Sequence, residues 1–300
     1  MTMIKSQNLA KICLGTAQFG LDYGVANKTG KVSKDEVFYI FKYAQKLGLK
    51  TLDTSIAYGN SEQVMGEFFL EAKDSFEVVS KILVDLDNFD SNKTKQIVYD
   101  SLQRLNFQAL YGCLIHRFDD YVKCDHIWTV LEDLKREGVI KKIGFSLYRL
   151  EELELLYERK VSFDLIQLPF SVFDRRFEKY FKLLKEKNVE IHVRSIFLQG
   201  LAFLDEGNLP TYLLDAQPQL KYLKKIATDK KISIEALCIN FVLLNSYIDK
   251  VIIGIDSLAH LKSNVSCLDY EDIVQENLIA LNSVEIKQED ILLPYKWKNN

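Results

Sequence analysis

The chain has 300 residues, 48% of them hydrophobic and 27% charged, so it can bury a large core and is not a disordered protein. Its 39 basic and 42 acidic residues leave a net charge of -3, and the basic residues form no stripe, which argues against nucleic acid or an anionic membrane as a partner. The first ten residues lack the apolar core of a signal peptide, and the most apolar stretch, residues 236–244, is far shorter than the ~20 residues of a membrane span. The sequence therefore predicts a cytoplasmic protein.

Five cysteines are scattered along the chain, and none stands in a C-x-x-C pair. This usage is typical of reduced thiols in a cytoplasm. No group of His, Cys and carboxylate residues has the spacing of metal ligands, so no metal site is predicted.

Short apolar runs alternate with longer amphipathic stretches from one end of the chain to the other. The expected strands are residues 12–15, 50–53, 76–82, 109–115, 140–145, 165–168, 189–193 and 250–254. The clearest expected helix spans residues 33–47, where apolar residues recur at helical spacing from Val37 and where Ser33 with Glu36 forms a capping box. Similar helical patterns cover residues 93–105, 126–137, 149–158 and 177–186.

Eight strands, each followed by a helix and with no linker between them, predict an α/β fold, a single (β/α)8 TIM barrel over residues 1–300. A doubly wound sheet is the alternative, but it requires a G-x-G-x-x-G loop after its first strand, and residues 15–20 do not fit that pattern. The segment from about residue 269 is expected to be a C-terminal extension, with one more helix around residues 279–284 before a polar tail.

Polar side chains stand at the ends of three consecutive expected strands. Asp53 ends the second strand, Lys81 lies at the end of the third and His116 follows the fourth, while Tyr58 lies in the loop after Asp53. Because the carboxyl ends of barrel strands form one rim, these four side chains are expected to converge. Taken singly, each has an ordinary explanation, as a turn carboxylate, a half-exposed aromatic, a solvated lysine or a core histidine.

As a set, the four residues can protonate a carbonyl oxygen while hydride reaches its carbon. Tyr58 is a weak acid at neutral pH unless a cation stabilises its phenolate, and Lys81 can supply that charge. Asp53 would hold Lys81 in place. His116 would donate a hydrogen bond to the same carbonyl oxygen.

The chain resembles the aldo-keto reductase family over residues 15–264. The motifs that carry the resemblance are Leu52-Asp53-Thr54-Ser55-x-x-Tyr58-Gly59-Asn60-Ser61-Glu62, Ser80-Lys81, Ser101-Leu102-Gln103-Arg104-Leu105 and Leu114-Ile115-His116-Arg117. The resemblance implies a barrel that binds NADPH or NADH in an extended conformation, with Asp53, Tyr58, Lys81 and His116 as catalytic residues. It also implies a set of cofactor contacts. These are Gly15, Thr16, Ser146, Gln167, Arg194, Ser195, Leu198, Gly200, Gly254, Asp256, His260 and Asn264.

Three positions depart from the family pattern. Leu147 follows Ser146 where the family has an asparagine, and Arg194 stands where an aromatic residue is common. Arg194 could stack on the nicotinamide, reach an anionic substrate or lie in solvent. The segment that meets the 2′ end of the cofactor offers Asp256, with His260 where an arginine is usual, which predicts good use of NADH unless Asp256 only caps the following helix.

The predicted activity is NAD(P)H-dependent reduction of a small-molecule aldehyde or ketone. A barrel isomerase or lyase without nicotinamide and a reductase-like regulatory or scaffolding subunit are the alternatives. Residues 144–148, 169–176 and 192–195 further resemble reductases associated with bacterial surface polysaccharide synthesis. That resemblance implies a sugar-like substrate, with a nucleotide-activated sugar as one form of it, and places Arg175, Arg176 and Arg194 near the active-site loops.

Overall fold

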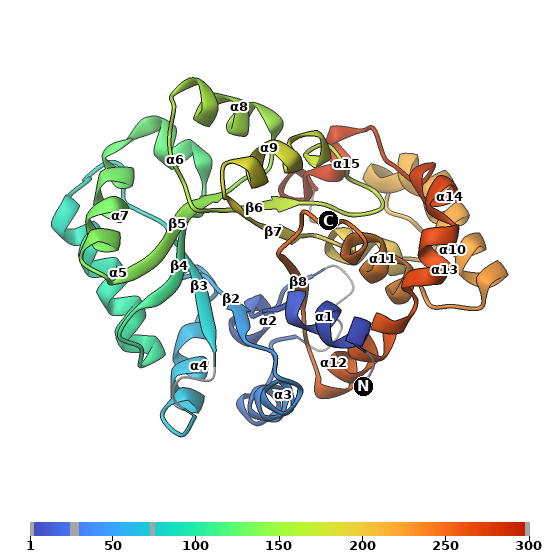
Figure 1. The fold of residues 1–300 in the computed structure, drawn as a ribbon, viewed down its shortest axis with the longest axis horizontal. Coiled ribbons are helices and arrows are strands. Elements are labelled where there is room, and N and C mark those ends of the chain that lie inside the picture. The colour runs from blue at the N-terminus through green and yellow to red at the C-terminus, as the bar shows by residue number, and fades with distance from the viewer. Residues whose placement is uncertain (1–2, 25–29, 73–75, 298–300) are drawn as a thin grey trace.

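Eight parallel strands close into one barrel in the computed structural model, which describes residues 3–24, 30–72 and 76–297 (Figure 1). Each strand pairs with the next in the chain, and β8 pairs with β1 to complete the ring. The strands are β1 Ile12–Gly15, β2 Thr51–Asp53, β3 Glu77–Ile82, β4 Leu110–Ile115, β5 Ile140–Ser146, β6 Leu165–Pro169, β7 Glu190–Arg194 and β8 Lys250–Gly254. The predicted (β/α)8 barrel is confirmed, and every expected strand is present within one residue at each end.

Helices lie outside the ring of strands (Figure 1). The α-helices are α1 Met3–Lys11, α2 Ala17–Gly20, α3 Lys34–Leu47, α4 Ser61–Phe69, α5 Ser91–Leu105, α6 Phe118–Lys123, α7 His126–Arg136, α8 Leu150–Glu158, α9 Phe181–Glu186, α10 Gln217–Lys230, α11 Ile234–Leu243, α12 Leu258–Ser266, α13 Glu271–Glu276, α14 Leu278–Asn282 and α15 Glu289–Leu292. Short 3₁₀ turns are η1 Glu178–Tyr180, η2 Leu198–Phe203, η3 Thr211–Ala216, η4 Cys267–Asp269 and η5 Pro294–Lys296.

Helix α3 is stabilised both by residues near it in sequence and by a contact with a distant segment. Its buried residues, Val37, Ile40, Phe41 and Ala44, follow helical spacing, and the Ser33 hydroxyl accepts the backbone N–H of Glu36 as predicted. The other half of the predicted capping box is wrong. The Glu36 carboxylate instead accepts the backbone N–H of Leu258, 2.6 Å away at the start of α12.

The loop after β2 lies directly on helix α2. A Cβ on Gly20 would stand 1.8 Å from the carbonyl oxygen of Tyr58, so only glycine permits this approach. Gly59 lies on the other side of the same contact and has a φ of 54°, in the left-handed region. These two glycines fix the backbone on which Tyr58 stands.

The C-terminal segment is more structured than the sequence predicts. In place of one helix and a polar tail, α13, α14, α15 and η5 follow one another. Ile291, Leu292 and Trp297 are buried, and the backbone N–H of Ile286 donates to Phe173 at 2.9 Å. The expected polar tail is therefore wrong, because apolar residues spaced among its charges cover the loops after β6.

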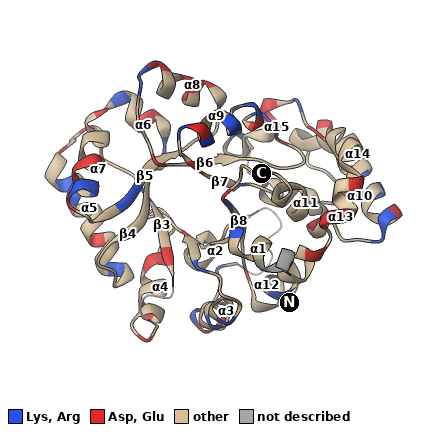
Figure 2. Ribbon diagram, in the orientation of Figure 1, with Lys and Arg blue, Asp and Glu red and all other residues tan. Residues whose placement is uncertain are grey.

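Lysine and arginine lie among aspartate and glutamate over the outer helices, and the strands are mostly uncharged (Figure 2). In the part of the chain that the structure describes, no helix combines the length and apolar character needed to cross a membrane. Over the same residues there is no group of three or more His, Cys, Asp or Glu arranged to hold a metal ion.

Candidate active site

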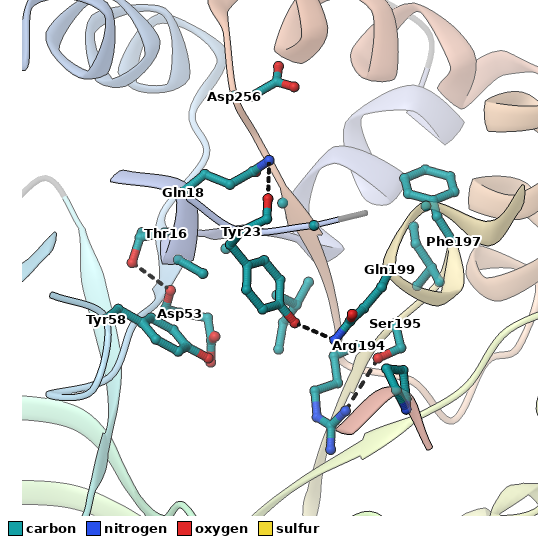
Figure 3. A pocket seen from close by; sticks show the side chains of 18 of the residues that line it. Thr16, Gln18, Tyr23, Asp53, Tyr58, Arg194, Ser195, Phe197, Gln199 and Asp256 are labelled. Carbon is teal, nitrogen blue, oxygen red and sulfur yellow. Dashed lines mark hydrogen bonds between the residues drawn. The ribbon is translucent and has the colours of Figure 1, made fainter. Parts of the chain in front are cut away.

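A cavity of about 350 Å³ opens at the carboxyl ends of the strands, where active sites of this architecture lie. All four predicted catalytic residues line it: Asp53, Tyr58, Lys81 and His116. Figure 3 shows Tyr58 and Arg194 at one side of the cavity and Asp256 at the opposite side. The cavity is therefore long enough to separate a reacting end from a second, distant end.

Lys81 and Asp53 form a buried ion pair at the base of the cavity. The Lys81 ammonium donates to both carboxylate oxygens of Asp53, at 2.8 and 2.7 Å, and to the carbonyl oxygen of Thr54 at 2.9 Å. Burial alone would lower the pKa of Lys81, but the Asp53 carboxylate and the Tyr58 hydroxyl outweigh it and hold this pKa above its ordinary value. Lys81 is therefore a fixed positive charge.

Tyr58 turns its hydroxyl toward that charge. The distance from the Lys81 ammonium to the Tyr58 hydroxyl is 3.5 Å, and the ammonium lies 5.1 Å from the centre of the ring. Burial raises the pKa of Tyr58, and Lys81 opposes that rise. The residue is thus protonated at rest, with a cation next to the oxygen that would become negative after proton transfer.

His116 stands edge-on to Tyr58, with ring centres 5.9 Å apart. Burial, followed by the positive charges of Lys81 and Arg194, lowers the pKa of His116 to about 3, so the ring is neutral at physiological pH. Ser55 Oγ lies 3.0 Å from His116 Nδ1, and its other acceptor, the Lys81 carbonyl oxygen, is farther at 3.3 Å. In the tautomer in which Ser55 donates to Nδ1, the ring proton lies on Nε2, and Nε2 can donate to a carbonyl oxygen.

Arg194 lies at the end of β7, and the possibility that it is simply solvated is wrong. It is half-buried, and its guanidinium stacks 3.9 Å from the centre of the Tyr148 ring. It also donates to the Leu147 carbonyl oxygen at 2.8 Å and to Ser195 Oγ at 3.3 Å. The side chain is held on a platform inside the cavity wall.

Most of the predicted cofactor contacts share the cavity with the catalytic residues. The residues on its wall that were predicted to bind the cofactor are Gly15, Thr16, Ser146, Gln167, Arg194, Ser195, Gly200, Gly254, Asp256 and His260. Thr16 ties the end of β1 to β2 through its hydroxyl, which donates to the Asp53 carbonyl oxygen at 3.0 Å. Gln167 donates its amide N–H to the Asp53 carboxylate at 2.6 Å, which leaves its amide oxygen as an acceptor.

Leu198 and Asn264 do not line the cavity. Leu198 lies in the hydrophobic core with no exposed surface, since the turn after β7 points its side chain inward. Asn264 is buried in α12, and neither its amide nitrogen nor its amide oxygen has a hydrogen-bond partner among the residues described. A buried amide with both atoms unpaired is costly. The predicted contact of Asn264 with the adenine stays a prediction.

The loop after β7 is held in an uncommon conformation. Ser195, Leu198 and Gln199 have φ values of 61°, 46° and 52°, and Gly200 follows with a φ of 97°. Left-handed backbone in non-glycine residues is costly and clusters at binding sites. A loop pre-shaped at this place fits the segment that the resemblance assigns to the nicotinamide and pyrophosphate.

The opposite end of the cavity is acidic. Ser257, not Asp256, caps helix α12, because its hydroxyl accepts the backbone N–H of His260 at 3.1 Å. Asp256 instead accepts a hydrogen bond from the Ser257 hydroxyl at 3.0 Å and lies 3.0 Å from His260 Nδ1. With Glu36 on the backbone of Leu258, two carboxylates stand at the first turn of α12. The alternative that Asp256 only caps the helix is therefore wrong.

Sequence reasoning missed several residues of the cavity wall. Tyr23 and Gln199 come from two loops and meet through a 3.0 Å hydrogen bond, seen in Figure 3, and Pro294 comes from the C-terminal segment. Tyr23 carried one usable signal, its position after the first strand, since loops after barrel strands form the site. Pro294 carried none, because its placement depends on contacts with distant loops.

Arg175 and Arg176 lie off the cavity. Arg175 binds Glu285 and Asn282 of the C-terminal segment, and Arg176 binds Asp174 at 2.7 Å. Both stand on the loop after β6, near the other loops of the site as predicted, but the carboxylates and carbonyl groups that they bind already occupy their guanidinium groups.

Comparison with known proteins identifies the family of the chain. The model of the Aldo/keto reductase family matches residues 11–286, so the chain belongs to that family. It is 24% identical to the uncharacterized oxidoreductase YqkF of Bacillus subtilis over 90% of this chain and 94% of the relative. It is 25% identical to L-galactose dehydrogenase of Arabidopsis thaliana over 95% and 94% of the two chains.

The solved structures agree on the fold. The holo form of aldo-keto reductase AKR11C1 from Bacillus halodurans superimposes with a TM-score of 0.73 at 22% identity, covering 93% of this chain and 94% of that one. Family membership makes the protein an NAD(P)-dependent oxidoreductase that acts on a small-molecule carbonyl compound.

Proposed function

We propose that the protein reduces an aldehyde or ketone with Tyr58 as the general acid. The observation that carries this is the chain of contacts from Asp53 to Lys81 to the Tyr58 hydroxyl, beside a neutral His116. A reduced nicotinamide, when bound, would supply the hydride. Tyr58 gives its proton to the carbonyl oxygen, Lys81 stabilises the phenolate that remains, and His116 donates a hydrogen bond that orients the same oxygen.

The residues on the cavity wall suit a nicotinamide cofactor. Ser146 and the free amide oxygen of Gln167 can hold the carboxamide, and the pre-shaped loop around Gly200 suits the pyrophosphate. At the far end, the carboxylates of Asp256 and Glu36 would repel a 2′-phosphate, whereas ribose hydroxyls can donate to Asp256. We therefore propose that NADH is used at least as well as NADPH.

A polar, sugar-like substrate is part of the same proposal. Tyr23, Tyr148 and His116 offer hydroxyl and imidazole groups around the reacting end, and a relative is named L-galactose dehydrogenase. The sequence resemblance to reductases of surface polysaccharide synthesis points the same way. The nucleotide-activated form loses its main support, since Arg175 and Arg176 are bound elsewhere.

Fluorescence titration with NADH and NADPH, followed by a screen of sugar and simple aldehydes, tests the proposal. We expect both cofactors to bind. We also expect the enzyme to oxidise the reduced nicotinamide faster with at least one sugar aldehyde than with hydrophobic aldehydes. Absence of cofactor binding would favour an isomerase or lyase. Binding without turnover of any carbonyl compound would favour a regulatory subunit.

A further inference from the structure

Arg194 is a half-buried cation without a carboxylate partner. In the described ranges it forms no ion pair, whereas Arg149, Arg175 and Arg176 on the surrounding loops each pair with an acid. Asp53, Glu235 and Asp256 also line the cavity, yet none is within 4.0 Å of the guanidinium. Removing a cation from water without a counter-charge is unfavourable, so the position is suited to a negative ligand.

The guanidinium is fixed before any ligand arrives. Tyr148 supports one face of it, at 3.9 Å, and the Leu147 carbonyl oxygen accepts one of its N–H groups. Tyr148 is supported in turn by the ring of Tyr295, with centres 5.1 Å apart, and its backbone N–H is held by the Glu152 carboxylate at 2.7 Å. A pre-positioned planar fork loses little entropy when it binds a carboxylate or phosphate.

Arg194 lies close enough to the reacting groups to act on them. Arg194, Tyr58 and His116 all line the same cavity. The charge of Arg194 accordingly contributes to the lowered pKa of His116 and opposes the burial-driven rise in the pKa of Tyr58. A guanidinium has five N–H groups, and the contacts with Leu147 and Ser195 use two of them. The remaining donors are available to a molecule in the cavity.

We propose that Arg194, stacked on Tyr148, binds an anionic group of the substrate while the substrate carbonyl lies at Tyr58. The preferred substrate is then an aldehyde or ketone that carries a carboxylate or a phosphate. This inference rests on the proposed reductase activity for its kinetic consequence, but the binding of an anion at Arg194 does not depend on that activity.

Matched substrates test the kinetic part. The first set pairs ω-oxocarboxylates of increasing length with alkanals of the same length, and the second compares glucose, glucuronate and glucose 6-phosphate. We expect the wild type to prefer an anionic member by about tenfold or more in kcat/KM, the usual size of one charge-assisted hydrogen bond. If the carboxylate substrates have the highest kcat/KM, the bound anion is a carboxylate; if glucose 6-phosphate has the highest kcat/KM, it is a phosphate.

Two variants and a control locate the effect. Arg194→Gln should abolish the preference and leave the Kd of NADH within about threefold, and Arg194→Lys should restore only part of the preference because an ammonium cannot form the planar fork. Arg117→Gln is the matched control, since Arg117 also bears on His116 but is 60% exposed, pairs with Asp120 and does not line the cavity. It should keep the full preference.

Calorimetric titration with succinate and with 1,4-butanediol tests binding without turnover. Succinate should bind the wild type and the Arg117→Gln variant, with and without NADH, and should bind Arg194→Gln at least about tenfold more weakly. The proposal is overturned if the wild type shows no anion preference and no succinate binding. It is equally overturned if Arg194→Gln weakens NADH binding about tenfold while the anion preference persists. Failure of all carbonyl turnover, with succinate binding intact, would instead refute the proposed activity.

Discussion

Two clusters of buried charge lie at opposite ends of the barrel strands. At the amino ends, Glu190 accepts hydrogen bonds from Tyr111 at 2.8 Å and from Lys142, and lies 2.7 Å from His192 Nε2. At the carboxyl ends, Asp53 binds Lys81 and Gln167. Both clusters hold a carboxylate among cationic and polar groups, yet only the second lines the cavity.

The two clusters differ in whether one of their side chains remains available to a ligand. Around Glu190, the three polar side chains contact the same carboxylate and none of them lines the cavity, so this cluster is closed to a ligand and its consequence is stability. Around Asp53, the ion pair extends through Lys81 to the Tyr58 hydroxyl, which faces open space. A buried charge network therefore marks a reacting site only where one of its members remains available to a ligand.

Removing the closed cluster's carboxylate should give the largest change in stability. Glu190→Ala leaves Lys142 and His192 without their anion, and we expect the free energy of unfolding to fall by about 3 kcal/mol, as when one member of a buried ion pair is lost. Urea denaturation measures this. Glu186→Ala, in an exposed pair on α9, is the control and should change little. A loss of kcat with unchanged stability would show that the amino-end cluster serves catalysis.

Tyr58→Phe should do the opposite. It removes the open end of the Asp53 cluster, so turnover should fall at least ~10²-fold, the usual contribution of a positioned acid. The unfolding free energy and the Kd of NADH should stay near wild type, because the ion pair beneath is intact. Single-turnover kinetics measures the rate, fluorescence titration the Kd and urea denaturation the free energy of unfolding. A variant that keeps most of its activity would refute Tyr58 as the acid.

The acidic end of the cavity offers a smaller test. Glu36→Gln combined with Asp256→Asn removes two negative charges near the first turn of α12. We expect NADPH to bind more tightly relative to NADH, so that the Kd of NADPH divided by the Kd of NADH falls about tenfold. Asp35→Asn, an exposed neighbour on the same turn of α3, should leave the ratio unchanged. A wild type that prefers NADPH above ~100-fold would show that another cation binds the phosphate.

The smallest expected effect is the pH dependence of the reaction near neutrality. Burial lowers the pKa of His116 to about 3 and raises that of Tyr58, so neither group changes its charge between about pH 5 and pH 8. Reductive kcat/KM should therefore be flat over that range. An inflection near the ordinary pKa of histidine, removed by replacing His116, would contradict the neutral ring.

Stability should respond to acid in a different range. Burial would raise the pKa of Glu190, but His192, Lys142 and Tyr111 hold it at about 2, below the ordinary value of 4.5. The unfolded chain then takes up a proton before the folded one does, so this contribution is present above pH 4.5 and is lost as the pH falls toward 2. Acid denaturation of the wild type and of Glu190→Ala should differ in that window.

The parts of the fold that were predictable are those set by neighbours in sequence. The strands are apolar runs, and Ser33 caps α3 from three residues away, so both could be read directly. The partner of Glu36 lies at Leu258, and the platform under Arg194 is built from the loop after β5 and the C-terminal segment. No local pattern encodes such contacts, which is why the capping box was predicted wrongly and the partners of Arg175 were not predicted.

The C-terminal segment makes completion of the site depend on residues that are synthesised after the barrel. Asp53, Tyr58 and Lys81 are synthesised before most of the barrel, but Pro294 of the cavity wall and Tyr295, which packs against the Tyr148 ring, are synthesised after all eight strands. A nascent chain thus carries its reacting groups long before it has a finished pocket around them. A protease cut just before Pro294 would leave all eight barrel strands whole but would remove both Pro294 from the cavity wall and the Tyr295 ring that packs against Tyr148.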